Sequence, residues 1–312
     1  AAASPGSPGI MTYNPTETPT PVTFVPRRKK RIKGSTIANY VFLIMCALFF
    51  AVPLYVIIVT SFKTMIQITE GQIFALPREW TTEPWYRAWN TLCTGMECNG
   101  IKAGFVNSVQ ILLPSIFISI AISAVTGYAL ALWKVRWAGT FLFVLFICAF
   151  VPFQIIMIPL IILISKTGLF GTYLAVAIVH AILSMPLLTL IFRNFYKDIP
   201  NELMNAAMMD SGSFWRVFFE IILPMSGNIM VVVLIMIITS VWNDYLVGMT
   251  FSGFNDQPMT LILVNAVITS RGEVIYNVNM AAALLTAIPP LVVYFGLGRF
   301  FVQGITAGAI KG

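Results

Sequence analysis

Charged residues are scarce in this 312-residue chain. Only 10% of its residues are Asp, Glu, Lys or Arg, whereas 58% are hydrophobic. Soluble domains carry about 25% charged residues, so the composition excludes an ordinary soluble protein and predicts an integral membrane protein. Six of the 19 Lys and Arg lie in one cluster, RRKKRIK at 27–33, directly before the first apolar run. Beside a membrane span, such a cluster sets topology more often than it binds nucleic acid.

Cysteine and histidine are also few. The four Cys and one His are scattered along the chain, without the clustering that a metal site needs, so no metal site is predicted. Cys46, Cys148 and His180 fall within apolar runs and are interpreted as packing residues. Cys93 and Cys98 fall in a polar stretch between two runs, where a disulfide and two free thiols both fit the sequence.

Motifs for chemistry are missing as well. The chain contains no G-x-x-x-x-G-K-[ST] motif, which cradles the phosphates of ATP. No set of nucleophile and base stands out among its residues. The sequence therefore predicts that this chain is not an enzyme and holds no cofactor of its own.

Long hydrophobic runs are what the chain has in abundance. Six charge-free windows exceed the roughly 20 residues that a helix needs to cross the hydrocarbon of a bilayer. Backbone groups in lipid must bond internally, so each window is predicted to be a helix, and prolines within them are expected to kink it. The predicted fold class is all-α, a polytopic membrane protein with six transmembrane helices, at 34–62, 103–133, 137–165, 167–192, 221–243 and 274–298.

The distribution of basic residues predicts the orientation. With the amino terminus in the cytoplasm, 13 Lys and Arg fall inside and six outside, which agrees with the positive-inside rule. Both termini are then cytoplasmic. The expected organisation is an appended linker at 1–10, a flexible tail at 11–36, the first span and outer loop at 37–104, a five-span core at 105–302 with a cytoplasmic insertion at 198–224, and a tail at 303–312.

The insertion is half polar, although it lies between two apolar runs. Its central stretch is NELMNAAMMDSGSFWRVFFEIILP, Asn201–Pro224. Ser211-Gly212-Ser213 is expected to break it into two helices, because Gly is permissive and Ser caps. Helical spacing places Leu203, Ala206, Ala207 and Asp210 on one face of the first helix, and Trp215, Phe218, Phe219 and Ile222 on one stripe of the second.

Two interpretations of the insertion fit these residues. One is an amphipathic helix that lies on the membrane surface. The other is a knob that inserts into a soluble partner, because two alanines on one face leave room for another surface. Leu223-Pro224 is expected to end the second helix and to lead into the fifth span.

The insertion resembles the signature loop of the permeases of ABC importers. That pattern runs Glu-Ala-Ala, two residues, Asp-Gly-Ala, then a Phe and an Ile-x-Leu-Pro ending. This chain departs from it where Asn205 replaces the Glu, and where Ser211 and Gly212 replace Gly-Ala; Glu202, one turn earlier, offers another carboxylate. The matching residues are Ala206, Ala207, Asp210, Phe218, Ile221, Leu223 and Pro224.

Two further stretches carry the same resemblance, which covers 37–312. The end RFFVQGITAGAIKG, 299–312, is similar to the tail of the carbohydrate-type, maltose-permease-like subfamily, and NSV at 107–109 resembles the opening of its permease core. The resemblance implies the type I ABC importer permease fold in a bacterial inner membrane. It also implies that Gly308, Lys311 and Gly312 in the tail contact an ATPase subunit.

The partners also follow from the resemblance. They are a second permease, two cytoplasmic ATPase subunits that carry ATP and Mg, and a soluble sugar-binding protein outside. TLCTGMEC, 91–98, is similar to glucose- and mannose-type members, which implies a monosaccharide substrate. The residues expected to couple this chain to the ATPase are Glu202, Asn205, Ala206, Ala207, Asp210, Ser211, Gly212, Phe218, Leu223 and Pro224.

Two stretches are candidates for contact with the solute or its binding protein. Asp244 lies at the outer end of the fifth span, where an ionisable group is a functional hypothesis by default; a simple position at the water interface is the alternative. Trp242, Asn243 and Tyr245 are expected to line a sugar path with it. The loop 251–276, with Gly253, Asn255 and Asp256, is expected to contact the binding protein, or else to be a plain connector.

An ion-coupled secondary sugar carrier is the alternative function. Such carriers usually show internal repeats and intramembrane charged groups. The predicted spans hold almost none, which favours the ATP-driven importer.

Overall fold

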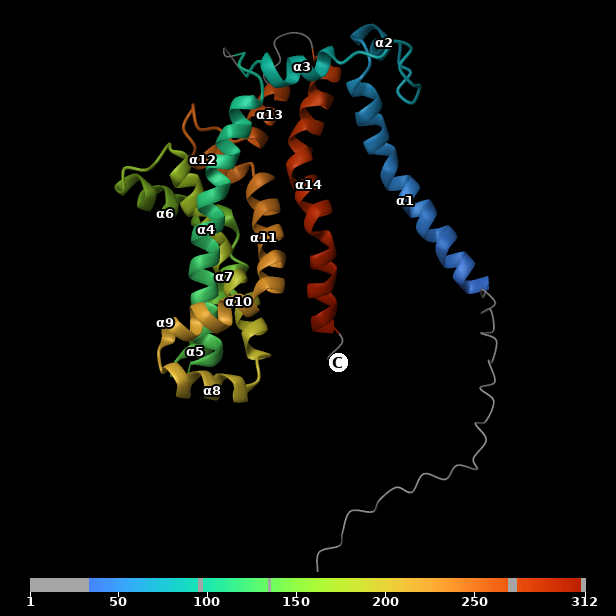
Figure 1. Cartoon of the computed structure of the whole chain (residues 1–312). Coiled ribbons are helices and arrows are strands. Elements are labelled where there is room, and N and C mark those ends of the chain that lie inside the picture. Colours follow the sequence, from blue (N-terminus) through green and yellow to red (C-terminus); the bar gives the residue numbers. More distant parts are fainter. Residues whose placement is uncertain (1–33, 95–97, 134–135, 269–273, 310–312) are drawn as a thin grey trace, which may run out of the picture. The chain divides into compact units, whose positions relative to one another are not determined.

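The computed structural model describes residues 34–94, 98–133, 136–268 and 274–309 (Figure 1). Within these ranges the chain is built of helices, and its β pairing is an isolated bridge between Gly171 and Ser252. The all-α prediction is therefore confirmed. The predicted linker at 1–10 and residues 11–33 of the predicted flexible tail, which include the basic cluster at 27–33, lie outside the described residues. Lys311 and Gly312 of the predicted tail at 303–312 also lie outside them.

The chain divides into two units, Ala1–Ala51 and Val52–Gly312. The first unit contains the start of α1 (Gly34–Ser61), whose side chains are almost all exposed. The second unit contains the end of α1 and the remaining helices. These are α2 (Met65–Thr69), α3 (Glu83–Asn90), α4 (Lys102–Leu132), α5 (Ala138–Ala149), α6 (Phe153–Lys166), α7 (Tyr173–Lys197), α8 (Asn201–Ser211), α9 (Phe214–Val217), the π-helix η1 (Phe218–Ile222), α10 (Leu223–Met225), α11 (Gly227–Trp242), α12 (Leu246–Phe251), α13 (Met259–Ile268) and α14 (Tyr276–Ala309).

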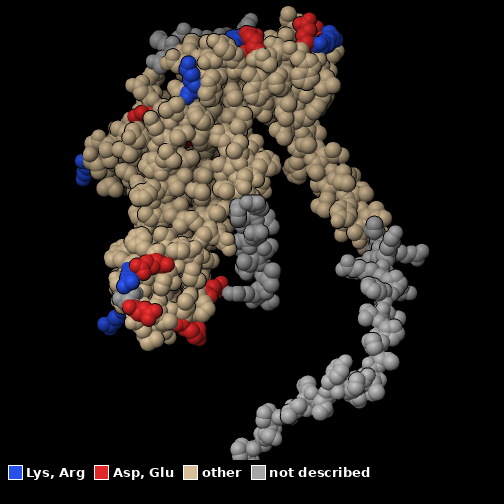
Figure 2. Space-filling view, viewed as in Figure 1, with Lys and Arg blue, Asp and Glu red and all other residues tan. Residues whose placement is uncertain are grey.

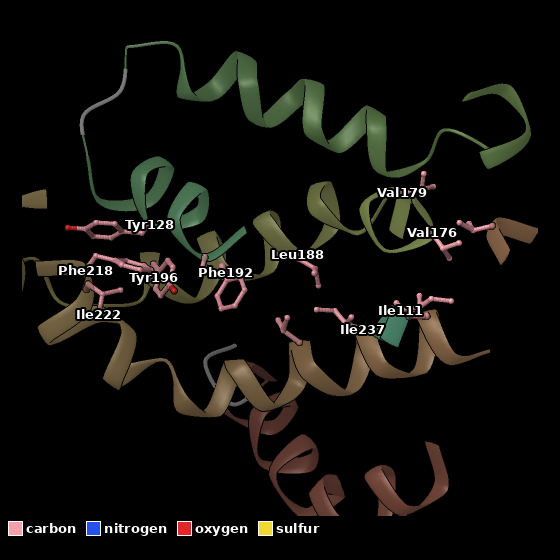
Figure 3. Close-up of a cluster of buried hydrophobic side chains, with 14 of the residues drawn as sticks. Ile111, Tyr128, Val176, Val179, Leu188, Phe192, Tyr196, Phe218, Ile222 and Ile237 are labelled. Atoms are coloured by element: carbon pink, nitrogen blue, oxygen red, sulfur yellow. The ribbon is translucent and has the colours of Figure 1, made fainter. Parts of the chain in front are cut away.

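Helices α4 and α7 make the most extensive contact of the second unit. Small residues recur about every fourth position on the buried side of α4, which lets the two backbones approach closely. At Gly127 the approach is tightest, because an added Cβ would lie 2.8 Å from the Phe192 Cβ and 2.9 Å from the Arg193 nitrogen. In Figure 3, Tyr128, Tyr196, Phe218 and Ile222 lie together at one end of the surrounding core, and Ile111, Val176, Val179 and Ile237 at the other.

Four helices are long and apolar enough to cross a membrane: α1, α4, α7 and the Tyr276–Gly298 part of α14. The count reaches the predicted six only if each of two bent helix pairs is one span. The chain is thus a multi-pass membrane protein. Figure 2 agrees, since charged side chains on the face shown gather near α2 and α3 and near α8 and α9, with mostly uncharged surface between them.

The prediction of one continuous helix over 137–165 is wrong. Helices α5 and α6 meet at a bend of 103°. Pro152 precedes α6 with φ −59° and ψ 133°, an extended conformation. Proline has no N–H for the helix ladder and its ring restricts the residue before it. The six other prolines of the predicted spans lie inside helices: Pro53, Pro114, Pro159, Pro186, Pro289 and Pro290.

Three other predicted boundaries are shifted. The fifth span begins at Gly227 rather than 221, after a 79° bend at Ser226. The loop predicted at 251–276 contains helix α13. Helix α14 continues to Ala309, so the predicted tail boundary at 303 falls inside a helix that includes Gly308.

The segment between α1 and α4 is fastened to α14 through Lys63. The Lys63 ammonium donates to the carbonyls of Gln72, at 2.8 Å, and Ile73, at 3.2 Å. The Asn277 amide donates to the Lys63 carbonyl at 2.9 Å. Lys63 is 3% exposed, and this burial lowers the pKa of its ammonium from the ordinary value.

Candidate functional site

The insertion forms the helix, break and helix that its sequence predicts. Helix α8 ends at Gly212, which has φ 60° and donates its N–H to the Met208 carbonyl at 3.0 Å. Such a left-handed cap suits glycine because it has no Cβ. Pro200 occupies the position before the helix rather than the first helical turn. The second arm comprises α9, η1 and α10, so Leu223-Pro224 does not end it; the helix continues to Met225.

The prediction that Ala206 and Ala207 of α8 both face a partner is wrong for Ala207, which is buried. Met204 and Ala207 are buried against the core of the protein, at 7% and 5% exposure, because they are three residues apart on one side of the helix. The opposite side is exposed. It presents Glu202, Leu203, Asn205, Ala206, Met209 and Asp210.

The predicted aromatic stripe of the second arm is divided in the same way. Phe218 and Ile222 are buried, and the Phe218 ring lies 5.4 Å from that of Tyr128. Trp215 and Phe219 are exposed and stack on each other with ring centroids 6.0 Å apart. All four positions lie on one stripe, but only the edge with Phe218 and Ile222 meets the core, and the edge with Trp215 and Phe219 stays exposed.

The second arm meets α11 at a closed bend. Ser226, which lies between them, is fully buried, and its hydroxyl hydrogen-bonds the Ile222 carbonyl at 2.6 Å and the Tyr196 hydroxyl at 3.3 Å. The centre of the bend is therefore enclosed and its hydroxyl is paired, whereas the flanking Met225 and Gly227 are exposed.

A pocket of about 340 Å³ lies beside the other bend, between α5 and α6. His180 from α7 is 6% exposed, and its Nε2 lies 3.8 Å from the Asp244 Oδ2. That oxygen also accepts the N–H groups of Val247, at 2.8 Å, and Gly248, at 3.1 Å, at the start of α12. The lining residues are Ala149, Phe153, His180, Leu183, Ser184, Leu187, Leu188, Met236, Ile237, Ser240, Asp244, Leu246 and Val247.

Of the four residues predicted to line a sugar path, the pocket includes one, Asp244. Trp242 is buried, and its indole N–H donates to the Thr286 carbonyl of α14 at 2.9 Å. Asn243 is exposed and Tyr245 half-buried, outside the pocket lining. Sequence reasoning interpreted His180 as a packing residue and missed its place beside Asp244. The available signal was a titratable side chain within an apolar span.

The segment before α4 and the loop after α12 meet around a smaller pocket of about 120 Å³. The Asn107 amide donates to the carbonyls of Asn255, at 2.8 Å, and Gln257, at 3.0 Å, which joins the start of α4 to the loop after α12. Gly253 packs against Gly171 so closely that a Cβ would clash with its carbonyl oxygen. Asn255 is exposed and Asp256 half-buried.

Two cysteines of the outer segment, Cys93 and Cys98, form a disulfide, which decides between the two alternatives left open by the sequence. Cys46 and Cys148 are free thiols. In the part of the chain that the structure describes, no group of three or more His, Cys, Asp and Glu side chains is arranged to hold a metal ion.

Comparison with known proteins gives a consistent family. A family model described as "Binding-protein-dependent transport system inner membrane component" matches residues 120–307. The probable ABC transporter permease protein PH1216 of Pyrococcus horikoshii is 38% identical over 52% of this chain and 59% of its own length. The osmoprotective compounds uptake permease protein GgtD of Synechocystis is 35% identical over 69% of this chain and 72% of its own. Other relatives are named for the transport of alpha-glucosides, arabinooligosaccharides, glucose and lactose.

A solved structure shares the fold. It is a chain of a bacterial ABC transporter involved in the import of the acidic polysaccharide alginate. The TM-score is 0.74 at 18% sequence identity, and the match covers 88% of this chain and 99% of that one.

Proposed function

This chain belongs to the family of binding-protein-dependent transport system inner membrane components, and from that premise we propose that it is a permease subunit of an ATP-driven sugar importer. In this proposal it forms half of the translocation pathway with a second permease. A soluble binding protein delivers the sugar outside, and two ATPase subunits, which carry ATP and Mg, act on it from the cytoplasm.

The division of α8 into a buried and an exposed side carries the proposal. A helix that lies on a membrane surface turns its apolar side to the lipid and is rich in Lys and Arg on its polar side. In α8 the apolar side, with Met204 and Ala207, is already used in the core of the protein. The exposed side carries Glu202 and Asp210, which form no hydrogen bond or ion pair within the described residues. Such a surface suits a protein partner.

The connection from this surface to the membrane helices supports coupling. The second arm packs on Tyr128 of α4 and joins α11 through the filled bend at Ser226. A push on the exposed side of α8 and on Trp215 and Phe219 therefore displaces packed helices as rigid bodies. The insertion and both termini are cytoplasmic in this proposal, and Gly308, Lys311 and Gly312 add contacts to the ATPase.

The substrate proposed is a monosaccharide such as glucose or mannose. The relatives support sugars as a class, since their names include glucose as well as oligosaccharides and glucosides. On the outer side, the loop with Gly253, Asn255 and Asp256 is the proposed contact for the binding protein, held in place by Asn107.

An ion-coupled sugar carrier is kept as the second candidate because of one observation. His180 and Asp244 form the kind of intramembrane ionisable pair that such carriers use. Uptake into proteoliposomes separates the two. The importer takes up sugar only with the ATPase subunits and ATP, whereas a carrier takes it up with this chain and an ion gradient alone.

The coupling role is tested in the reconstituted importer with Gly212→Val and Asp210→Asn. Val at the left-handed position is expected to cost about 1–2 kcal/mol and to misdirect the second arm. Because this cost falls on the conformation that docks with the ATPase, ATP-driven uptake should fall about tenfold. Asp210→Asn is expected to lower uptake less. Gly139→Val is the matched control, because Gly139 has open space around it and no positive φ. Normal uptake by both test variants would rule out the docking role.

A further inference from the structure

The pocket beside the α5–α6 bend lies where the chain leaves regular helix within an apolar, charge-free stretch. Ala149 ends α5 and Phe153 begins α6, and both line the pocket. Irregular backbone within a membrane is tolerated where it is buried in protein or lines a cavity. Discontinuous helices border the solute sites of many transporters. The position of the bend thus indicates a cavity that binds a solute rather than a packing defect.

His180 is the strongest indication of a ligand. Its side chain is more than nine-tenths buried, yet neither ring nitrogen forms a hydrogen bond within the described residues; the nearest partner is the Asp244 carboxylate, 3.8 Å away. Hydrogen bonds to a buried ring of this kind are worth about 0.5–1.5 kcal/mol each, and the 3.8 Å contact with Asp244 does not supply one. A molecule in the pocket that hydrogen-bonds the ring would supply it.

Two further polar groups converge on the same space. The Asp244 Oδ1 accepts no hydrogen bond within the described residues, since both backbone donors of α12 go to Oδ2. Ser184 lies one turn after His180 on α7, and its hydroxyl likewise has no partner within that part of the chain. One ring, one carboxylate oxygen and one hydroxyl can together bind two or three adjacent hydroxyl groups.

The size and walls of the pocket limit the ligand. A volume of about 340 Å³ lies near the lower end of the roughly 300–1,000 Å³ range for small-molecule sites, so the pocket suits one sugar ring rather than a chain of them. The Phe153 ring and aliphatic side chains such as Leu183 and Ile237 can cover the C–H face of that ring. An anionic ligand would meet the Asp244 carboxylate.

We propose that this pocket is a solute subsite carried by this chain itself, which binds one neutral sugar ring through His180, Ser184 and Asp244. The ring nitrogen and the serine hydroxyl bind sugar hydroxyls, and the free carboxylate oxygen accepts one. This inference rests on the proposed function, because it places the subsite on the pathway of the importer.

Protection of an introduced thiol tests occupancy directly. Ser240→Cys, at a pocket-lining position outside the three proposed ligands, is made in a Cys46→Ser, Cys148→Ser background, assembled into the complete importer without ATP, and treated with a water-soluble thiol reagent. Labelling is expected to slow about tenfold with saturating d-glucose, as occupancy of a site excludes the reagent, and to stay unchanged with the polyol-free osmolyte betaine. Ser119→Cys on α4, a buried position outside the pocket, is the matched control. Equal labelling with and without d-glucose would overturn the subsite.

Transport kinetics separate binding from a merely structural role. Removing one partner of a ligand hydroxyl is expected to raise the KM for sugar about tenfold in His180→Leu and Asp244→Asn, with less change in kcat. His180→Gln, which keeps a donor, is expected to recover part of the affinity, and Ser119→Ala to match the unmodified importer. Unchanged KM in all pocket variants, with ATP-driven uptake intact, would refute the subsite and leave the proposed function standing. Loss of ATP dependence in the unmodified importer would instead refute the proposed function.

Discussion

The two sharp bends of the second unit, 103° between α5 and α6 and 79° before α11, are built differently. The bend before α11 is filled at its centre, where Ser226 is fully buried and hydrogen-bonded to the Ile222 carbonyl and the Tyr196 hydroxyl, although the flanking Met225 and Gly227 are exposed. At the α5–α6 bend, Phe150 is 72% exposed on one side, and Ala149 and Phe153 border an open pocket on the other.

The difference indicates what each bend is suited to do. A filled joint resists compression and passes displacement on, because protein interiors are as closely packed as organic crystals. A joint that borders a cavity leaves space for a molecule. We infer that the bend at Ser226 serves transmission and the bend at Pro152 serves binding, and three changes test this contrast.

The largest effect is expected from Ser226→Leu. No space is available for the larger side chain, and overpacking of this kind costs about 1–3 kcal/mol. The melting temperature of the purified chain should fall and ATP-driven uptake should be largely lost. Ser226→Ala keeps the volume and removes only the hydroxyl, so it should cost about 1 kcal/mol. Equal behaviour of the two variants would show that the joint is not tightly filled.

A smaller effect is expected from Pro152→Ala at the other bend. Proline in a compatible conformation stabilises a protein by about 0.4–1 kcal/mol because it lowers the conformational entropy of the unfolded chain. Alanine should therefore lower the free energy of unfolding by that amount. Packing of α5 on α7 should hold the bend. Spin labels at Gly139 and Lys166 should report an unchanged distance. A longer distance would show that the proline alone imposes the bend.

The smallest effect is expected from breaking the ion pair between Arg216 and Glu220 on the second arm. Arg216 and Glu220 are 3.0 Å apart and about 60% exposed. Exposed pairs at this spacing contribute about 0.3–0.5 kcal/mol and are screened by salt. Arg216→Gln should therefore change the melting temperature little, and less still at high salt. A large, salt-independent loss would mean that the arm depends on this pair.

The sequence was sufficient for features set by local chemistry. Gly212 could be predicted as a helix break because glycine, which has no Cβ, adopts the left-handed conformation whatever packs around it. The approximate place of the apolar helices followed from length and composition, but the predicted number of six is reached only if each bent pair is one span. Pro152 was expected only to kink a continuous helix, but a kink and a 103° bend look alike in sequence, because the angle depends on what packs against each arm.

Features set by tertiary contact could not be predicted. Ala206 and Ala207 are adjacent and chemically identical, yet one is exposed and the other buried, since only the neighbouring core decides which side of α8 it covers. His180 and Asp244 are far apart in the chain and meet only because α7 and the end of α11 converge. Their meeting is a property of the fold.

The bond between Cys93 and Cys98 provides an independent reporter of sidedness. Such bonds form and persist in oxidising compartments and are rare where glutathione keeps thiols reduced. Mass spectrometry of the chain taken from cells, with thiols blocked before lysis, should therefore find this pair oxidised if the segment faces the periplasm. Once this segment is assigned to a compartment, the side of every other loop follows from the number of membrane-spanning helices between them.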